Sequence, residues 1–543
     1  MATVITPVMP VPTVEMSYFD AIVKALDEDD KKVALARNYH NGYQETYMDA
    51  RVKEFLDLHS GIHPFNLNIC RTITLAVKDE LSVSGFNTSE TADAEGLKPQ
   101  AKWAWDLWTA CQMDSIQSEV HESALADRET FIIVIWDYRN NRPSFIHNYR
   151  YTPLDVGGYS DGQGVWAIYE NDDINQPMKY AVKQWIQTDY SPTGTAKSYT
   201  RRTLYYPDRI EKWQSTGGGW THYLEQGIDP ETGEPKEPWP IPWVNDAKEP
   251  LGIPVIHFRN VGMMPEAWDA IPIQDAVNKT LVDILASNDL TAFQMLVALG
   301  WYPTTDGKEP KSDKSNLLKV GPGQFIGSKD PNAKFDVVKG NDPSALVTAL
   351  QDMIMMAAQV TGTPTSRFTT TKLIASAETL KNQDQQLKKK ATDRRVLFGD
   401  SWEHCMEMAR KLNNFFGTGD ELDETVVFFT TWLNNQTLED LAAKKLLGIP
   451  EETLWAEAGY SAEQIVNMKK TAEYLAREAG WQSSIYLAQH PELHNQGGPN
   501  NTDTTGGSKN NPDTKSTDTK GNTAKAVAKV ATRSTAGGKP ATT

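Results

Sequence analysis

The sequence contains very little cysteine: Cys70, Cys111 and Cys405 are the three among 543 residues. Because they are odd in number and far apart, they cannot form a disulfide framework or a cysteine-based zinc site. Long apolar runs are also missing, since the longest, such as Phe131–Trp136 and Met295–Leu299, are far shorter than the ~20 residues of a membrane-spanning helix. The N-terminus lacks the basic stretch of a secretory signal, so we expect a soluble, cytosolic protein without a membrane contact.

Basic residues are too few for a protein that coats nucleic acid. The chain has 54 Lys and Arg against 71 Asp and Glu, a formal net charge of −17. From His494 to Thr543 there is no Leu, Ile, Phe, Tyr or Trp, and seven Lys and Arg face three Asp, a net of +4. Such a segment cannot bury enough apolar area to offset its ordering entropy, so we predict a disordered basic tail. Subtracting this tail leaves −21 for residues 1–493, which makes the body strongly acidic.

Signatures of catalysis are absent or incomplete. The Gly158–Gly162 segment has the spacing G-x-S-x-G, but a nucleophile elbow needs a following helix, whereas strand signals follow here. The His-Glu pair that begins at His121 would need a second histidine where Leu125 stands, so one zinc ligand of an H-E-x-x-H motif is missing. His59 and His63 have a metal-binding spacing, yet the glycine and proline beside them favour a loop without metal. No P-loop occurs, and we expect no catalytic residue, metal or cofactor.

Hydrophobic periodicity predicts an α+β chain that is mainly helical. Residues 16 to about 125 follow the helical repeat, for example over Asn68–Leu81. From Thr130 to Tyr223 short apolar runs alternate with turn residues, which predicts an antiparallel strand meander. Residues 229–250 contain six prolines and are predicted to form an extended connection.

Long helices are predicted beyond the meander. One runs from Pro272 to Leu299, about 27 residues or roughly 40 Å, and another follows Pro343. The longest extends from Ser376 to about Phe416, about 40 residues, with apolar positions spaced by three, four or seven. Three short helices close the body.

The segments between these helices carry other signals. Residues 300–342 show short strand patterns at Leu317–Val320, Gln324–Ile326 and Phe335–Val338. Thr361–Thr371 is rich in threonine and is predicted to be an irregular polar loop.

Several local segments, taken together in order, resemble one family. They are Tyr39–Gly42, Asn68–Arg71, Leu81–Phe86, Lys179–Trp185, Leu204–Asp208, Leu251–Asn260, Ile273–Asn278, Ser376–Leu380 and Phe398–Trp402. No single segment is specific, but the collinear set over residues 30 to 480 resembles the portal proteins of tailed bacteriophages, in the branch typified by portals of Bacillus siphophages.

The resemblance implies a mainly helical α+β portal fold. It has an antiparallel β-meander wing, two stem helices, a small α/β clip, a long channel-side helix and a helical crown. We therefore expect the wing over residues 1–265, stem helix 1 over 266–299, the clip over 300–341, stem helix 2 over 342–360, the tunnel loop over 361–375, the long channel-side helix over 376–416, the crown over 417–490 and the disordered basic tail over 491–543.

The resemblance also implies a function and a set of partners. Such a protein forms a homododecameric ring with a central channel at one vertex of the capsid, is part of the virion and assembles in the host cytoplasm. Double-stranded DNA passes through the channel during packaging by the terminase, whose large subunit docks on the ring, and leaves by it during infection. The major capsid protein, the scaffolding protein and a head–tail adaptor are the other expected partners.

Cations near the DNA are expected to be few, because the acidic body repels a polyanion and keeps it off the channel wall. In the predicted tunnel loop the charged residues are Arg367 and Lys372. Repeated around a ring, each would form a circle of positive charge, so we expect both to line the channel and to contact the DNA backbone transiently. The alternative is that they pair with neighbouring acids and do not face the lumen.

A basic band on the long helix is a second candidate for DNA contact. It comprises Lys388, Lys389, Lys390, Arg394 and Arg395. Lys388, Lys389 and Arg394 are its expected contacts, but three consecutive lysines spread over about 200° of a helix, so they cannot all face DNA. Ion pairs between subunits, with Asp384 or Asp393, are the alternative role.

Two other functions compete with the portal. A connector ring of the same virion is expected to be a much shorter chain, without a very long helix preceded by a polar loop. An enzyme such as a metal-dependent hydrolase would need a cluster of carboxylates or histidines, and the sequence shows none.

Overall fold

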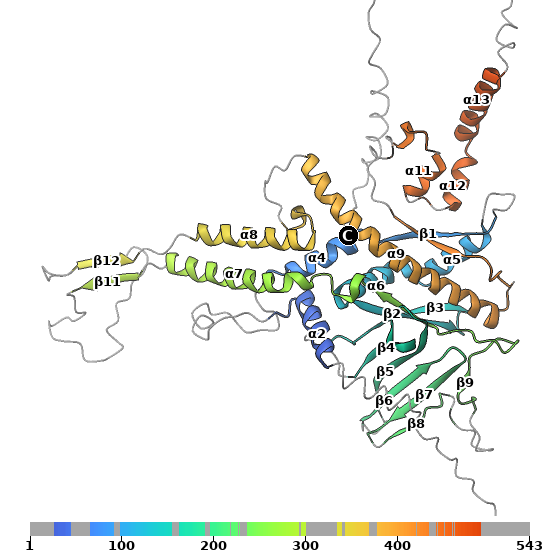
Figure 1. Cartoon of the computed structure of the whole chain (residues 1–543), viewed down its shortest axis with the longest axis horizontal. Coiled ribbons are helices and arrows are strands. Elements are labelled where there is room, and N and C mark those ends of the chain that lie inside the picture. The colour runs from blue at the N-terminus through green and yellow to red at the C-terminus, as the bar shows by residue number, and fades with distance from the viewer. Residues whose placement is uncertain are drawn as a thin grey trace, which may run out of the picture. The chain divides into compact units, whose positions relative to one another are not determined.

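The computed structural model describes most of the chain in two compact units, residues 1–471 and 472–543, and each unit is described by itself (Figure 1). The described residues are 27–44, 66–91, 98–154, 162–190, 196–217, 219–225, 227, 236–292, 295–299, 334–338, 343–368, 377–419, 421–433, 441, 444–449, 451–458, 460 and 462–489. In the second unit the described element is helix α13 (Ala472–Gln489). The predicted basic tail, His59 and His63 lie outside the described residues.

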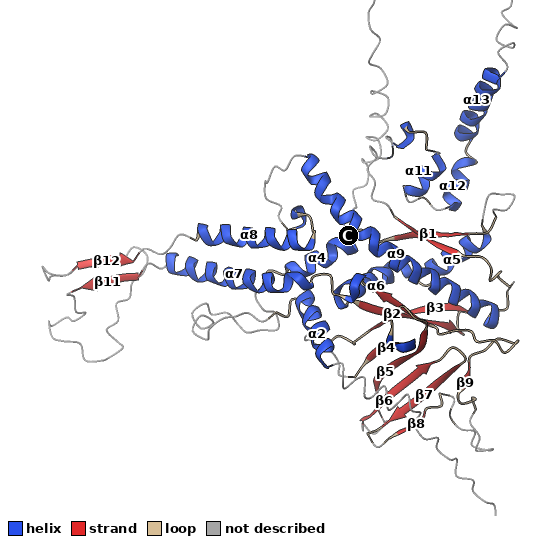
Figure 2. Cartoon of the chain, viewed as in Figure 1, coloured by secondary structure: helices blue, strands red, loops and turns tan. Residues whose placement is uncertain are grey.

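Helices precede and follow a central block of strands, as Figure 2 shows. The helices of the first unit are α2 (Asp27–Asn41), α4 (Ile69–Lys78), α5 (Pro99–Ala110), α6 (Met113–Asp127), α7 (Ile271–Ala292), α8 (Ser344–Thr361), α9 (Ala377–Phe416), α11 (Glu451–Glu457) and α12 (Ala462–Lys469), with 3-10 turns η1 (Glu170–Asp172), η2 (Val261–Met263), η3 (Trp268–Ala270) and η5 (Thr365–Arg367). The strands are β1 (Val83–Thr88), β2 (Glu129–Asp137), β3 (Arg142–Tyr149), β4 (Gly164–Tyr169), β5 (Met178–Tyr190), β6 (Ala196–Tyr205), β7 (Arg209–Ser215), β8 (Trp220–His222), β9 (Ile241–Pro242), β10 (Val255–Arg259), β11 (Met295–Leu299), β12 (Lys334–Val338) and β13 (Phe428–Trp432).

The predicted antiparallel meander is confirmed, but its strands divide between two sheets. Strands β4 to β8 pair in sequence order, with β9 added to β7. Strands β2 and β3 form a separate sheet with β10, in which Val255 lies opposite Ile133. Apolar side chains of the two sheets, among them Phe131, Val165 and Ala181, pack in one buried cluster. The strand β10 falls beyond the predicted meander, because the chain returns to this sheet only after the proline-rich connection.

Helix α9 confirms the predicted long helix and organises the main core. The predicted seam is buried at Leu387, Ala391, Phe398, Trp402, Cys405, Ala409 and Leu412. This face packs on β2, β3 and β10. At its centre the Trp402 ring lies 4.8 Å from the Trp108 ring and 4.6 Å from the Phe258 ring, both in edge-on contact. Such aromatic pairs add stability beyond the apolar area they bury, so α9 is held firmly to the sheet.

Helix α7 is shorter than the sequence predicts. It begins beside Pro272 as expected but ends at Ala292, and Met295–Leu299 forms strand β11 instead of the last turns of the helix. A short apolar run is compatible with a helix or a strand. Here it forms a strand because it pairs with β12 in antiparallel fashion, with Met295 opposite Val338. The predicted strand at Phe335–Val338 is confirmed within β12, whereas those at 317–320 and 324–326 lie outside the described residues.

Strands β1 and β13 are missing from the sequence prediction, which places helices in both regions. They pair with each other, with Thr88 opposite Phe428. Next to these strands, the Val427 N–H donates a hydrogen bond to the Ser89 hydroxyl, 338 positions away in the sequence. A short strand containing Gly85 and Asn87 has weak local strand propensity, so only the distant partner defines it.

His121, on α6, lies in the core and uses both ring nitrogens. Its Nε2 accepts a hydrogen bond from the Trp402 indole N–H at 3.0 Å, and its Nδ1 lies 3.2 Å from the Leu81 carbonyl oxygen. Because an indole N–H can only donate, Nε2 is unprotonated and Nδ1–H donates to Leu81. The imidazole is therefore neutral, and burial lowers the pKa of His121 from 6.5 to about 3.

This neutral histidine predicts a pH dependence of stability. Between pH 6.5 and about 3 the unfolded chain binds a proton at His121 that the native chain does not. The free energy of unfolding therefore has its full value above pH 6.5 and decreases as the pH falls below it. The slope reaches up to about 1.4 kcal/mol per pH unit. His121→Gln, whose amide can replace both hydrogen bonds, is expected to flatten this slope in urea unfolding measured at several pH values. The exposed His404→Gln is the control, and an equal slope in wild type and His121→Gln would contradict the assignment.

Candidate functional site: a charged junction between the paired helices and the long helix

Helices α7 and α8 lie side by side and meet the rest of the unit at one place (Figure 1). Here the end of α4, the segment before α7, the end of α8, turn η5 and the first half of α9 come together. We call this place the junction and define it by its charged side chains. These are Asp79, Glu80, Glu266, Arg367, Lys390, Arg394 and Arg395.

Local sequence explains why these elements end where they do. The Asn68 side chain accepts a hydrogen bond from the Arg71 N–H at 3.1 Å and so caps the start of α4. Helix α4 ends at Lys78, so Asp79 and Glu80 follow directly at the negative end of its dipole. Helix α8 is stopped by Gly362, whose φ of +63° is a left-handed C-cap conformation that glycine adopts without strain.

Glu266 is the buried anion of the junction. Its side chain is 1% exposed and forms ion pairs with Lys390 and, at 3.0 Å, with Arg394 on the next turn of α9. Burial raises the pKa of the carboxyl, but the two cations and a hydrogen bond from Asn260 outweigh this and hold the pKa below its usual value. Lys390 also donates to the Thr361 carbonyl oxygen at 2.7 Å. Two successive turns of α9 therefore join the segment before α7 to the end of α8.

The end of α4 forms the second, more exposed part of the junction. Arg367 of η5 lies with Nη1 3.2 Å from Asp79 Oδ2 and with Nη2 3.6 Å from Glu80 Oε1. Arg395 of α9 donates from Nη2 to the Glu80 backbone oxygen at 2.6 Å and to the Leu433 backbone oxygen at 3.3 Å. Phe368, next to Arg367, packs against the buried clusters of α4, α7 and α8. Turn η5 is thus held by the ion pairs of Arg367 and by the apolar contacts of Phe368.

The structure sorts the cations that the sequence suggested for DNA contact. Lys388 and Lys389 are exposed on α9. Arg394 is engaged with Glu266 of its own chain, while Asp384 and Asp393, the partners considered from the sequence, are exposed. Lys372 lies outside the described residues.

Sequence reasoning missed the acids of this junction. Glu266 has no local pattern that distinguishes it from a surface acid. Asp79 and Glu80 fell within the predicted helix Asn68–Leu81, which ends three residues earlier in the structure. The useful signal is the end of a helix followed by two acids, which is a favourable place for an arginine.

Buried amides anchor the first turns of α7 to α4. Gln274 Oε1 accepts from the Ile69 N–H at 2.8 Å, and its Nε2 donates to the Leu67 oxygen at 2.6 Å and to Asn278 Oδ1 at 2.9 Å. Asn278 Nδ2 in turn donates to Gln44 Oε1 at 2.6 Å. A buried amide is costly unless its hydrogen bonds are made, so this network fixes the register between α7 and α4.

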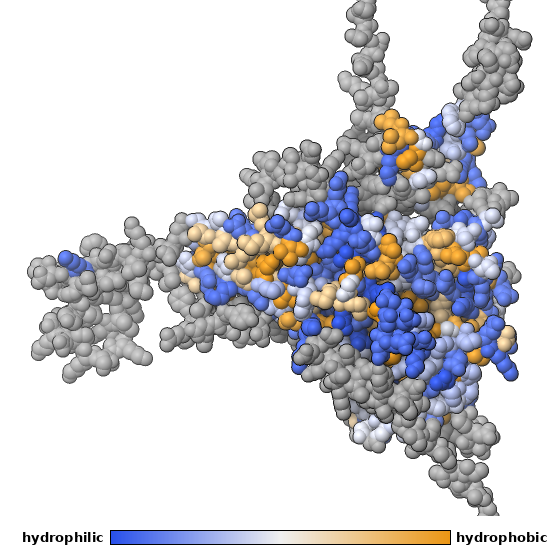
Figure 3. Space-filling view, in the orientation of Figure 1, coloured by the Kyte–Doolittle hydropathy of each residue, from blue (hydrophilic) through white to orange (hydrophobic). Residues whose placement is uncertain are grey.

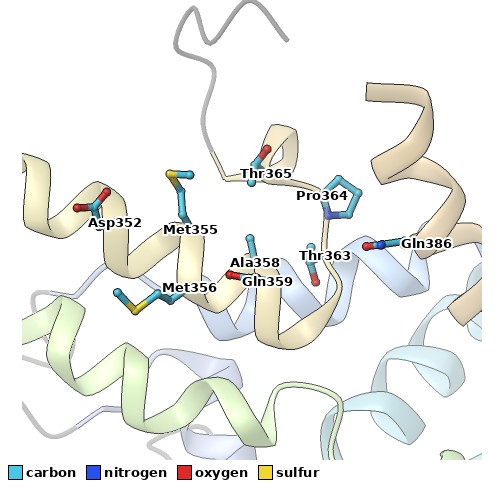
Figure 4. Close-up of a pocket in the computed structure, with 9 residues that line it drawn as sticks. All are labelled: Asp352, Met355, Met356, Ala358, Gln359, Thr363, Pro364, Thr365 and Gln386. Carbon is cyan, nitrogen blue, oxygen red and sulfur yellow. The ribbon is translucent and has the colours of Figure 1, made fainter. Parts of the chain in front are cut away.

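A groove of about 570 Å³ lies beside the junction, between α8, the segment that follows it and α9 (Figure 4). Its lining consists of Asp352, Met355, Met356, Ala358, Gln359, Thr363, Pro364, Thr365 and Gln386. In Figure 4, Met355 and Thr365 point to the same side of α8, and Gln386 reaches toward Thr363 from α9. Among the described residues of this lining, Asp352 is the one charged side chain, and the others are apolar, amide or hydroxyl groups.

The outer face of α8 is uncharged apart from Asp352. The helix Ser344–Thr361 contains no other charged residue, and Met355, Met356 and Val360 are each at least half exposed. Figure 3 shows tan to orange surface over α7 and α8 and hydrophilic, blue surface near the middle of α9. An exposed helix face with this composition is typical of a surface that packs against another protein.

Other candidate sites give no functional centre within the described ranges. In the residues that the structure describes, no group of three or more His, Cys, Asp or Glu could hold a metal ion. Within the same residues no helix is long and apolar enough to span a membrane. The three cysteines are free, and Cys70 and Cys405 are buried.

Comparison with known proteins identifies the class. Residues 77–478 match the family model described as phage portal protein, SPP1 Gp6-like. The portal protein of Mycobacterium phage L5 is 23% identical over 421 residues, which cover 73% of this chain and 76% of the relative. The portal protein of Mycobacterium phage D29 is 22% identical over 288 residues, 50% of this chain, and the match spans about half (54%) of the relative's length.

These matches define a structural protein of a tailed phage and not an enzyme. Because the family model covers well over half of the sequence, the chain belongs to the SPP1 Gp6-like family of phage portal proteins. The resemblance found in the sequence is thereby confirmed.

The buried ion pairs of Glu266 predict a large effect of its neutralisation. Glu266→Gln leaves Lys390 and Arg394 beside an uncharged group, so the unfolding free energy is expected to fall by about 3 kcal/mol in urea unfolding. Asp283→Asn removes an exposed ion pair with Lys279 and is expected to cost less than about 0.5 kcal/mol. Equal effects of the two substitutions would show that the Glu266 pairs are not a main support of the junction.

Proposed function

We propose that this chain forms a homododecameric ring whose channel passes double-stranded DNA into and out of the phage head. Membership of the portal family carries this proposal, since phage portal proteins are virion components that assemble as rings and contact capsid and DNA. The terminase large subunit, the major capsid and scaffolding proteins and a head–tail adaptor are the proposed partners, with assembly in the host cytoplasm. No step of this function requires catalysis by the chain itself.

The described elements fit the parts that we propose for the portal. Helices α7 and α8 serve as the stem, and the antiparallel pair β11–β12 belongs to the clip. We assign residues 361–375, of which 361–368 are described, to the tunnel loop. Helix α9 faces the channel, and the sheets β4–β8 and β10–β2–β3 form the wing. Since β13 pairs with β1 in the wing, we place the start of the crown after Trp432 and not directly after α9.

The uncharged face of α8 supports ring assembly. Its exposed Met355, Met356 and Val360 would be unfavourable in water, and in the ring we place a neighbouring copy on this face. Methionine side chains adapt to uneven surfaces, which suits an interface between copies.

Charge supports passage of DNA without tight binding. A net charge of −17 per chain, repeated around a ring, repels the polyanion. We propose that the few cations that contact DNA are Arg367, Lys372, Lys388 and Lys389, whereas Arg394 acts within its pair with Glu266. Brief contacts from a few residues allow a genome to slide, while many would hold it.

The first experiment measures the assembly. Light scattering of the purified protein is expected to give a mass near 730 kDa, about twelve copies of 60.6 kDa, and electron microscopy is expected to show a central hole. A phage that lacks this chain is expected to form heads without DNA. A monomer of 60.6 kDa, or normal DNA filling without the chain, would overturn the proposal.

Charges on the α8 face are expected to break the ring. Met355→Glu with Met356→Glu places two anions on the proposed interface, so the mass in light scattering is expected to fall well below that of the ring. Tyr138→Glu alters a more exposed apolar residue on the β2–β3 turn and is expected to leave the mass unchanged. An intact ring of the double variant would remove α8 from the interface.

Exposed lysines on α9 are expected to set part of the salt dependence of DNA binding. For the assembled ring and a short duplex, Lys388→Ala with Lys389→Ala is expected to reduce the slope of log K against log salt by about 0.9 for each phosphate that these lysines neutralise in the wild type. Lys388→Arg with Lys389→Arg keeps the charge and is expected to keep the slope. If the alanine variant has the wild-type slope, these lysines do not contact DNA.

A further inference from the structure

Arg367 differs from the other cations of the junction in the kind of anion that it contacts. Lys390 and Arg394 pair with Glu266, which is almost completely buried, and Arg395 donates to backbone oxygens. Arg367, by contrast, is 36% exposed, and its closest partner Asp79 is 45% exposed. Water and dissolved ions therefore reach this ion pair, although they do not reach Glu266.

The Arg367 ion pairs are well placed but weak. The negative end of the α4 dipole and two adjacent carboxylates attract the guanidinium, and Phe368 keeps η5 near them. At 3.2 Å, with side chains 36% and 45% exposed, the Arg367–Asp79 contact is nevertheless a surface ion pair, and such pairs contribute little net free energy. The contact with Glu80 is longer, at 3.6 Å, and the Glu80 side chain is 10% exposed. An arginine fork binds a phosphate with two hydrogen bonds as readily as it binds a carboxylate.

We propose that Arg367 is an exchangeable cation with two alternative anionic partners, the Asp79–Glu80 carboxylates and a phosphate of double-stranded DNA. The inference rests on the proposed function, because it requires DNA to pass the junction. With the acids in place, a phosphate binds Arg367 only by displacing them. The acids therefore weaken each contact and let DNA move on.

The test removes the competing acids in the assembled ring. Asp79→Asn with Glu80→Gln is expected to tighten binding of a short duplex about 2- to 5-fold for each copy of Arg367 that contacts it. The slope of log K against log salt is expected to become steeper by about 0.9 for each additional phosphate that is neutralised. Asp79→Asn alone, which changes only the exposed acid, is expected to give part of the same increase in affinity.

Two controls separate exchange from a general change of charge. Asp172→Asn with Asp173→Asn removes two exposed wing acids and is expected to change binding little. The same Asp79 and Glu80 substitutions are then made in an Arg367→Gln ring. Because Asp79 also pairs with Lys78, any increase in affinity from a freed Lys78 persists in this background and is subtracted.

The two backgrounds decide the outcome. An increase in affinity that is present with Arg367 and absent with Arg367→Gln supports exchange. An equal increase in both backgrounds, or no increase with Arg367, overturns it, even if the ring forms and heads fill with DNA. Failure of the proposed function is seen separately, as a monomer in light scattering or as DNA filling that does not need the chain.

Discussion

A buried carboxylate that needs two cations is the constraint on which the arrangement of the long helices depends. An ionised Glu266 without partners would cost several kcal/mol in so dry a place. Lys390 and Arg394 lie one turn apart on α9, so the carboxylate can pair with both only when this part of α9 lies against the segment before α7. Lys390 also binds the Thr361 oxygen at the end of α8. One acid thereby sets the relative positions of three helices.

The net charge of the chain has a different role from the buried, paired charge of Glu266. Acids outnumber bases, which keeps a polyanion away from the surface, and most cations of the junction are already paired within the chain. The face of α8, with Asp352 as its one charge, fits the proposed ring, in which it packs against a second copy and further charges would have to be buried. An excess of acids, paired cations and an apolar helix face are what the proposed channel, made from repeated copies, would require.

The sequence predicts best what depends on local pattern. The α9 seam, the helical pattern that begins at Asn68 and the helix after Pro343 follow from residue spacing and helix-end signals, and the structure has all three. Elements defined by distant partners could not be predicted in this way: β1 needs β13 across more than 300 residues, and β11 is a strand only because β12 pairs with it. The residues of the junction also differ in how well the sequence predicts them. Arg367 stands out as one of two charges in a polar loop, whereas Glu266 gains its role from an arginine 128 positions away.

The junction separates contacts that must persist from contacts that can exchange. Loss of the Glu266 pairs would cost several times the ~0.2–1 kcal/mol of an exposed pair such as Arg367 with Asp79. Arg395 donates to the backbone oxygen of Glu80, and release of Arg367 leaves this contact between α9 and the end of α4 in place. Phe368 limits how far η5 can move, because its ring is packed among apolar residues of α4, α7 and α8. A change of partner at Arg367 therefore alters the local charge without loosening the helices around it.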